Sequence, residues 1–351
     1  MGERLEHQGY DVKVSIAVAS YNGANFIAEQ LDSLYAQTRR PDEVVVADDS
    51  STDDTLRILE GYRARPDCSL TVLRNDTGSP LRPPSNFNRA LAACSGDVVL
   101  CCDQDDRWDP TKIAASLERL SARPGLACVL NDTRICDADL NPRGVTKMGQ
   151  VRAAGLPDES FVMGCCAAFR REFLDIALPI PPQITHDGWL VGLSDLLGLT
   201  ERSEDVLQSY RIHGENVSKG FFINAADDTG RLHMARRRLT AIAWRWSSND
   251  ALLRELVWLR EAEDRLSART ANILATYPSA RLGESLNRLR RQRAVLERRR
   301  GVRTARGGGR IASLWTAWHN GTYHGANGLL AALKDALVRL EPTAEFVLWR
   351  R

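Results

Sequence analysis

The 351-residue sequence has no uninterrupted apolar run of the roughly 18 to 20 residues that a membrane-spanning helix needs. Its first eleven residues are polar and lack the apolar stretch of a secretory signal, so we expect a chain that is not exported. The eight cysteines show no C-x-x-C spacing, which argues against a structural zinc site. Buried free thiols in a reducing cytoplasm therefore explain these cysteines better than disulfides do.

Two glycine-rich signatures are also missing. No Gly-x-Gly-x-x-Gly follows the first strand-like run, where the sequence instead continues Ser20-Tyr21-Asn22-Gly23, and this excludes a nicotinamide-dependent dehydrogenase. A glycine-rich basic loop near the same run is absent, which argues against a sugar nucleotidylyltransferase. We also find no internal repeat.

Charge is unevenly distributed along the chain. The overall formal charge is +2, but residues 1–230 carry a net charge of −12 and residues 231–351 carry +14. Hydrophobic residues make up 43% and charged residues 26%, which is typical of a globular chain and excludes wholesale disorder. The length allows two or three domains. We therefore predict two regions, a catalytic domain over 12–222 and a basic, mainly α-helical region over 223–351.

The first half alternates short apolar runs with amphipathic stretches. We predict strands at 12–19, 43–47, 69–74 and 97–102, and helices at 24–37, 52–63, 85–93 and 110–120. This order predicts an α/β fold with a mostly parallel sheet flanked by helices, in which ligands bind at the carboxyl ends of the strands. Farther along, we predict a helix at 187–197, a strand at 205–211, long helices within 232–277 and 282–300, a flexible break at the glycines 307–309, and a last amphipathic stretch at 326–340.

Acidic residues gather where the predicted strands end. Five carboxylates that would meet there are Asp48, Asp49, Asp103, Asp105 and Asp106. Such a group is tolerable mainly when a cation or ligand hydrogen bonds compensate its charge. The Asp-x-Asp pair directly after a buried strand favours Mg²⁺ or Mn²⁺ bridging a diphosphate, whereas Asp53 and Asp54 are better explained as residues that start a helix.

Three segments together resemble the family-2 glycosyltransferases of the GT-A fold. They are VSIAVASYNG at 14–23, VADDSSTD at 46–53 and DQDDRW at 103–108, and the resemblance extends from about residue 13 to residue 220. It implies an inverting transfer of a sugar from a nucleotide diphosphate donor to a glycan or lipid-linked acceptor, with Mn²⁺ or Mg²⁺ as cofactor.

The resemblance also implies roles for individual residues. The donor would be bound by Ala19, Ser20, Tyr21, Asp48, Asp49, Arg74, Asn86, Asp103 and Gln104, with Tyr21 stacking on a pyrimidine and Asp48 or Asp49 accepting its N3 proton. The metal would be held by Asp103, Asp105 and His213, or Arg211 and His213 would instead bind the departing diphosphate. The acceptor side would include Gly164, Trp108 and Trp189.

Asp187 is the candidate catalytic base, because an inverting transfer needs a carboxylate to accept the proton of the acceptor hydroxyl. The alternative is an acid favoured by the dipole at a helix N-terminus. The motifs at 104–108, 186–189 and 210–214 together resemble a rhamnosyltransferase-like branch that builds bacterial polysaccharides. We therefore expect dTDP-rhamnose as donor, with a UDP-hexose or another deoxysugar as alternatives.

The basic C-terminal region allows three interpretations. The first is docking on an anionic membrane, through arginines 236–238 and 298–300 and the tryptophans Trp244, Trp246, Trp258, Trp315, Trp318 and Trp349. The second packs these tryptophans inward and pairs the arginines with the acidic half, or forms a homodimer. The third is a non-enzymatic protein that binds nucleic acid, which we consider less fitting than an enzyme. We expect a cytoplasmic protein, peripheral on the inner face of the membrane, with no nucleic-acid partner.

Overall fold

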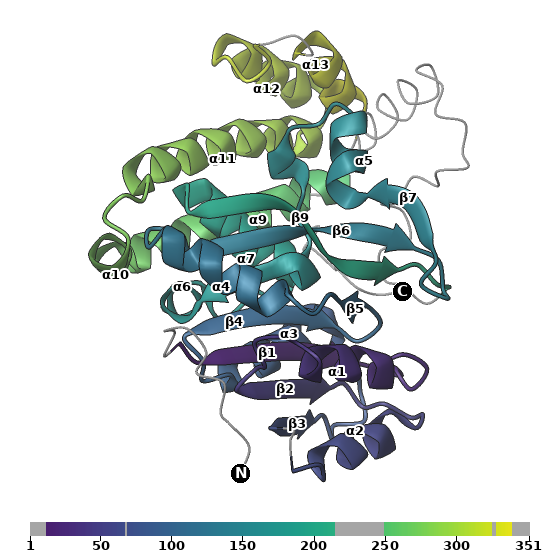
Figure 1. Cartoon of the computed structure of the whole chain (residues 1–351). Coiled ribbons are helices and arrows are strands. Elements are labelled where there is room, and N and C mark those ends of the chain that lie inside the picture. Colours follow the sequence, from purple (N-terminus) through teal and green to yellow (C-terminus); the bar gives the residue numbers. More distant parts are fainter. Residues whose placement is uncertain (1–11, 67–68, 215–248, 325–327, 339–351) are drawn as a thin grey trace. The chain divides into compact units, whose positions relative to one another are not determined.

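The computed structural model describes residues 12–66, 69–214, 249–324 and 328–338. The chain divides into two compact units, Met1–Ala225 and Ala226–Arg351 (Figure 1). The first unit contains a sheet with helices on both faces, and the second is helical where it is described. Each unit is considered by itself below.

Strands and helices alternate through the first unit. Its elements are β1 (Val14–Ser20), α1 (Ile27–Tyr35), β2 (Glu43–Asp48), α2 (Thr55–Arg63), β3 (Leu70–Arg74), α3 (Arg82–Ala93), β4 (Val98–Asp103), β5 (Arg107–Trp108), α4 (Lys112–Ala122), β6 (Cys128–Cys136), β7 (Pro142–Thr146), α5 (Lys147–Ala153), the 3₁₀ helices η1 (Asp158–Ser160) and η2 (Gly164–Cys166), β8 (Ala167–Arg170), α6 (Arg171–Ala177), α7 (His186–Leu197) and β9 (Thr200–Arg211).

These strands form one nine-stranded sheet in the order β3-β2-β1-β4-β8-β6-β9-β5, with β7 paired to β6. The first four strands in this order are parallel, as the β-α alternation predicts. Strand β8 then runs antiparallel to both of its neighbours, β4 and β6. The α/β fold class is confirmed, and the antiparallel β8 is a feature that the sequence pattern does not predict.

The parallel strands β1, β2 and β4 are buried on both faces, whereas the edge strand β3 is partly exposed. One face packs its branched side chains against α1, α2 and α4, and the residues in this core include Val14, Ile16, Val18, Ile27, Leu31, Leu34, Val44, Val46, Leu59, Leu100, Ile113 and Leu117. Because side chains alternate along a strand, Ala17 and Ala47 point to the opposite face, where α3 contacts β1 and β2. The small alanine side chains allow α3 to lie close to the sheet.

The second unit is a set of helices, which confirms the predicted C-terminal helical region. They are α9 (Asn249–Ala268), α10 (Thr270–Thr276), α11 (Leu282–Thr304), α12 (Gly308–His319) and α13 (Gly328–Leu337). The first part of the helix predicted within 232–277 lies outside the described residues. The helix break predicted at the glycines 307–309 is present between α11 and α12, where Gly307 has a φ of 51°, but Gly308 and Gly309 already belong to α12. Among the described residues, no helix has the length and apolar composition to cross a bilayer.

Asp335 on α13 is the centre of a buried ionic network in the second unit. Its carboxylate accepts hydrogen bonds from Arg299 Nε and Arg303 Nε, both at 2.7 Å, and from the Tyr323 hydroxyl at 3.0 Å. Arg303 and Asp335 are fully buried, and Arg299 nearly so. The aspartate therefore offsets charge of the two buried guanidinium groups.

We expect Asp335→Ala to lower the free energy of unfolding by about 3–5 kcal/mol, because it leaves two buried guanidinium groups without their anion. Chemical denaturation of the full chain, followed by circular dichroism of the helices, measures this loss. Asp264→Ala, at an exposed position on α9, is the matched control and should change stability by at most about 0.5 kcal/mol. A loss below about 1 kcal/mol for Asp335→Ala would contradict the assigned role.

Candidate active site

The polar residues at the ends of the parallel strands lie at one edge of the sheet. Ser20 at the end of β1 is in register with Asp48 at the end of β2, and Asp48 is in register with Arg74 at the end of β3. On the other side of β1, Ala19 is opposite Asp103, the last residue of β4. The edge predicted to bind a ligand is therefore formed by the residues that the sequence pattern indicated.

The loops after β1 and β2 are bound to each other. The Asn22 amide N–H donates to Ser51 Oγ at 2.9 Å, and Asn22 Oδ1 accepts from the Thr52 N–H at 2.8 Å. Asn22 has a φ of 48°, in the left-handed region that asparagine tolerates better than most residues. Asp53 accepts from the N–H groups of Ala24 and Thr55, both at 3.0 Å, and so has the structural role expected for it.

Gln104 connects the loop after β4 to the loop after β1. Its Oε1 accepts from the Tyr21 N–H at 2.9 Å, and its Nε2 donates to the Tyr21 carbonyl at 3.0 Å. A Cβ atom at Gly23 would lie 2.2 Å from Gln104 Oε1, so only glycine allows this pair of bonds. Tyr21 itself is 46% exposed, which leaves its ring accessible to a stacking base. Gln104 thus fixes Tyr21, and its own contact with the donor stays a prediction.

Asp48 and Asp49 are both buried and accept hydrogen bonds from the surrounding loops. Asp48 accepts from the hydroxyls of Ser20 at 3.0 Å and Ser51 at 2.6 Å. Asp49 accepts from the backbone N–H groups of Leu81 at 2.7 Å and Arg82 at 2.8 Å. Both carboxylates thus hold the surrounding loops in place. Their contact with a nucleotide base stays a prediction. Arg74 has an exposed side chain, 3.9 Å from Asp76, and its donor contact also stays a prediction.

Asn86 does not face the site as we expected. It is 2% exposed, its Nδ2 donates to the carbonyls of Ala47 at 2.7 Å and Ser20 at 3.3 Å, and its Oδ1 accepts from Arg89. Arg89 also donates to the carbonyl oxygens of Leu73 and Arg74. Asn86 and Arg89 therefore bind backbone carbonyls at the ends of β1, β2 and β3. We correct the direct nucleotide contact predicted for Asn86 to this structural role.

Asp105 and His213 are 108 positions apart in the sequence, and their side chains are in contact. Asp105 Oδ2 lies 2.9 Å from His213 Nε2, both side chains are largely buried, and the imidazole ring packs on Phe26 with ring centroids 4.5 Å apart. Arg211 donates to the Asp105 carbonyl at 2.8 Å and pairs with Glu29. Arg211 therefore holds the loop that carries Asp105, and the alternative in which it binds the departing diphosphate is not supported.

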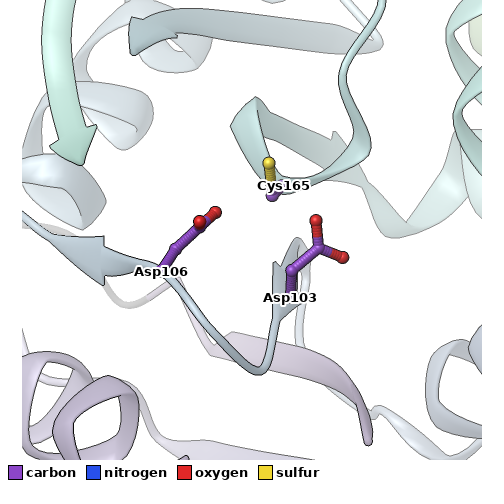
Figure 2. A group of neighbouring side chains, drawn as sticks. All are labelled: Asp103, Asp106 and Cys165. Atoms are coloured by element: carbon purple, nitrogen blue, oxygen red, sulfur yellow. The ribbon is translucent and has the colours of Figure 1, made fainter. Parts of the chain in front are cut away.

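Asp103 lies next to a second acidic residue and a thiol. The possible ligand atoms of Asp103, Asp106 and Cys165 lie within 4.8 Å of one another (Figure 2). Burial, followed by the charge of Asp105, raises the pKa of Asp103 to about 7. Burial also raises the pKa of Asp106, with the charges of Asp105 and Asp103 adding to the effect. The carboxylates in this site thus destabilise one another's charged forms.

A buried lysine, Lys112, contacts residues next to this cluster. The sequence pattern did not indicate that it belongs to the site. Lys112 is fully buried, and its ammonium donates to the Cys165 carbonyl at 2.6 Å and to the side chain of Gln208. Gln208 in turn donates to Asp106 at 3.3 Å. The positive charge of Lys112 lowers the pKa of Asp103, which partly offsets the neighbouring carboxylates. Lysine in the first turn of an amphipathic helix usually faces solvent, so no sequence pattern indicated this role.

Asp105 and His213 are in direct contact at 2.9 Å and offer a carboxylate oxygen and an imidazole nitrogen to a divalent cation. Asp103 offers a further carboxylate, but the described ligand atoms that lie within 4.8 Å of its own are those of Asp106 and Cys165. Carboxylate oxygen and imidazole nitrogen are suitable ligands for Mn²⁺, whereas the Cys165 thiol favours softer metals. Asp106 is buried and accepts from Gln208 and the Arg211 N–H, so it supports the site rather than facing it.

Asp187 lies in the first turn of α7, which Thr185 caps through the Gly188 N–H. Asp187 Oδ1 accepts from the same N–H at 2.7 Å. Its charge contributes to the raised pKa of Asp103, so the two carboxylates share one region of the site. The preceding residue, His186, stacks on Phe87 with centroids 3.8 Å apart.

Gly164 is required for the packing of His186. A Cβ atom at Gly164 would lie 2.1 Å from His186 Nε2, so any larger residue would displace the imidazole. Gly164 is itself buried, in η2. Its predicted place near the acceptor side therefore becomes a packing role beside the candidate base.

The two tryptophans predicted on the acceptor side belong to the core. Trp189 is 0% exposed and donates its indole N–H to the Ala177 carbonyl at 2.8 Å. Trp108 is 3% exposed, and the Lys112 ammonium lies 3.9 Å from its ring centroid. Large aromatic side chains bury much apolar area, and this outweighs a surface position for both. We correct the acceptor-side assignment of Trp108 and Trp189 accordingly.

Comparison with known proteins agrees with this geometry. Residues 15–176 match the model of the family described as Glycosyl transferase family 2. The match supports a family-2 glycosyltransferase domain. It includes the candidate donor-side residues from Ser20 to Asp105 and ends before Asp187 and His213.

Proteins similar to this chain include an uncharacterized glycosyltransferase of Nostoc sp., 28% identical over 218 residues, which cover 58% of this chain and 66% of that protein. A second is the poly(ribitol-phosphate) beta-N-acetylglucosaminyltransferase TarS of Staphylococcus aureus, 40% identical over 97 residues, which cover 27% of this chain and 16% of TarS. The chain thus spans just under two thirds of the Nostoc protein and much less of TarS.

The fold of the family-2 domain is also found in solved structures. A crystal structure of S. aureus TarS 1–349 in complex with UDP-GlcNAc superposes with a TM-score of 0.50 at 20% sequence identity, covering 89% of this chain and 93% of that one. This likeness shows the fold, and the GT-A fold predicted from the sequence is confirmed.

Proposed function

We propose that the chain is a metal-dependent, inverting glycosyltransferase that transfers a sugar from a nucleotide diphosphate donor to a glycan or lipid-linked acceptor in bacterial polysaccharide synthesis. The observation that carries the proposal is the contact between Asp105 and His213 beside Asp103, at the carboxyl ends of the parallel strands. Ligands bind at this edge in open α/β sheets.

The donor nucleotide would be bound by the loops after β1 and β2. Tyr21 offers an exposed ring whose backbone is fixed by Gln104, and Asp48 and Asp49 brace the adjacent loops. Because these loops are already hydrogen-bonded to each other, little ordering would be needed when the nucleotide binds.

Asp103, Asp105 and His213 would hold the Mn²⁺ or Mg²⁺. When bound, the ion supplies a positive charge against the diphosphate and stabilises the negative charge of the leaving nucleotide. Arg211 and Gln208 do not contact the donor in this proposal. They hold the Asp105 loop and Asp106, respectively, so that the ligand oxygens face the site.

Asp187 would act as the base. The Gly188 N–H fixes Oδ1 of its carboxylate, and the acceptor hydroxyl would transfer its proton to this group as the hydroxyl oxygen attacks the anomeric carbon. The attack takes place opposite the leaving diphosphate, so the anomeric configuration inverts.

Two donors are candidates. The motifs at 104–108, 186–189 and 210–214 support dTDP-rhamnose. A UDP-hexose is supported by the similarity to TarS, a beta-N-acetylglucosaminyltransferase. Motifs shared by a branch describe the scaffold better than the sugar pocket, so the choice is one for experiment.

A panel of nucleotide sugars, tested by thermal melting with and without Mn²⁺, decides the donor. We expect the true donor at about one hundred times its dissociation constant to raise the melting temperature by about 5 °C or more, and EDTA to remove most of this shift. Stabilisation by UDP-sugars with none from dTDP-rhamnose would exclude the rhamnose donor. No shift and no donor hydrolysis with any nucleotide sugar would contradict the proposed function.

A further inference from the structure

Helices α12 and α13 expose an unusual number of large apolar side chains. Seven of the eleven exposed large hydrophobic residues in the described part of the chain lie on these two short helices, which contact each other (Figure 1). They are 40% to 82% exposed and comprise Ile311, Trp315, Trp318, Leu329, Leu330, Leu333 and Leu337. Soluble proteins rarely leave such a group exposed without a function.

The two helices place small residues inward and large apolar residues outward. The buried positions are Ala317 on α12 and Gly328, Ala332 and Asp335 on α13. Ile311, Trp315 and Trp318 follow the i, i+4, i+7 spacing of a single helix face, and Leu330, Leu333 and Leu337 follow i, i+3, i+7. An ordinary surface helix has the reverse arrangement, so the outward apolar faces need an apolar environment of their own.

The charges around these faces have one sign. In the described residues 305–324 and 328–338 the only acidic side chain is Asp335, which is fully buried between Arg299 and Arg303. The basic residues of the same stretch are Arg306, Arg310 and Lys334. An apolar face bordered by basic residues and free of exposed acids is complementary to an anionic lipid surface.

We propose that the apolar faces of α12 and α13 insert into the interfacial region of an anionic lipid membrane. A second copy of the chain fits less well, because a two-fold interface would place the same basic residues of the described stretch opposite each other. Trp315 and Trp318 would lie at the level of the headgroups, and the leucines of α13 would reach the acyl boundary.

This surface differs from the one expected from the sequence. Of the arginines at 298–300, Arg299 is buried on Asp335, and Arg298 donates to Thr322 at 2.6 Å. The arginines at 236–238 and the tryptophans Trp244, Trp246 and Trp349 lie outside the described residues. Trp258 is half-buried on α9. The apolar faces of α12 and α13, rather than an arginine cluster, carry the inference.

Co-sedimentation of the full chain with vesicles tests the proposal. We expect binding to phosphatidylcholine vesicles that contain phosphatidylglycerol, weaker binding to pure phosphatidylcholine, and only partial loss of binding in high salt. The triple substitution Ile311→Ser, Trp315→Ser, Leu337→Ser should lower the partition coefficient at least about a thousandfold, because each inserted apolar side chain favours binding by roughly tenfold or more. All three side chains are exposed, so its melting temperature should match that of the unmodified chain.

Leu156→Ser together with Leu274→Ser is the matched control. Both leucines are nearly half exposed but lie elsewhere, and their loss should leave vesicle binding unchanged. If the unmodified chain binds neither type of vesicle at low salt, the proposal is overturned. The proposal would also be overturned if the unmodified chain is a dimer, the triple variant is a monomer and neither binds vesicles. A second copy of the chain would then cover the apolar faces. Binding that appears only after deletion of residues 339–351 would assign the faces to the chain's own terminus and likewise overturn it.

Discussion

Asp105→Asn should lower the rate of sugar transfer by about 10² to 10³-fold or more. A divalent cation supplies several kcal/mol of transition-state stabilisation, and each 1.36 kcal/mol corresponds to about tenfold in rate. Asparagine keeps the size of the side chain but removes the charge that would hold the cation beside His213. Steady-state transfer at saturating donor, measured over a range of Mn²⁺ concentrations, tests this. The variant should also need more Mn²⁺ for half of its maximal rate.

The fold should survive this substitution. Asparagine can still hydrogen-bond to His213, and the Arg211 bond goes to the Asp105 backbone carbonyl, which the substitution does not alter. Asp175→Asn, on the exposed face of α6, is the matched control for loss of one carboxylate and should leave the rate unchanged. If Asp105→Asn keeps full activity in EDTA, neither Asp105 nor a metal takes part in the way we propose.

The sequence predicted the parallel part of the fold because that part is built from local patterns. Each β-branched run became a strand and each amphipathic stretch a helix, within a few residues, from Val14 to Ala122. Parallel strands also fix where their ends lie, so Asp48 and Asp103 could be placed at one edge from the sequence alone. The contact of Asp105 with His213 followed from motifs rather than from spacing, since β9 joins the sheet far from β4.

What the sequence could not predict depends on tertiary packing. Strand β8 is only four residues long and pairs antiparallel between β4 and β6, an arrangement that no local pattern specifies. Trp189 and Asn86 were expected at the site because the family resemblance implies a role for each. Helical periodicity turns these two side chains inward, where the indole bonds to Ala177 and the amide to Ala47. Trp315 and Trp318 were expected on a docking surface, but the outward leucines of α13 were not, because periodicity identifies an apolar face without telling which way it points.

Asp187→Asn should lower kcat by about 10² to 10⁴-fold with little change in nucleotide affinity. A positioned general base contributes a factor of this size, and asparagine cannot accept the proton of the acceptor hydroxyl. The substitution keeps the local structure, because Asn Oδ1 can accept from the Gly188 N–H and Thr185 still caps α7. Initial rates with saturating donor and acceptor give kcat, and titration with the free nucleoside diphosphate gives the affinity.

The alternative explanation of Asp187, an acid that favours the N-terminus of α7, predicts a different result. Glu172 occupies the same position in the first turn of α6, where it is exposed, so Glu172→Gln measures the dipole effect alone. We expect that control to cost about 0.3–1 kcal/mol of stability without changing the rate. If Asp187→Asn behaves in the same way, Asp187 is a structural acid. If it loses nucleotide binding instead of kcat, Asp187 belongs to the donor site, and the base must be sought among the other carboxylates that face Asp103.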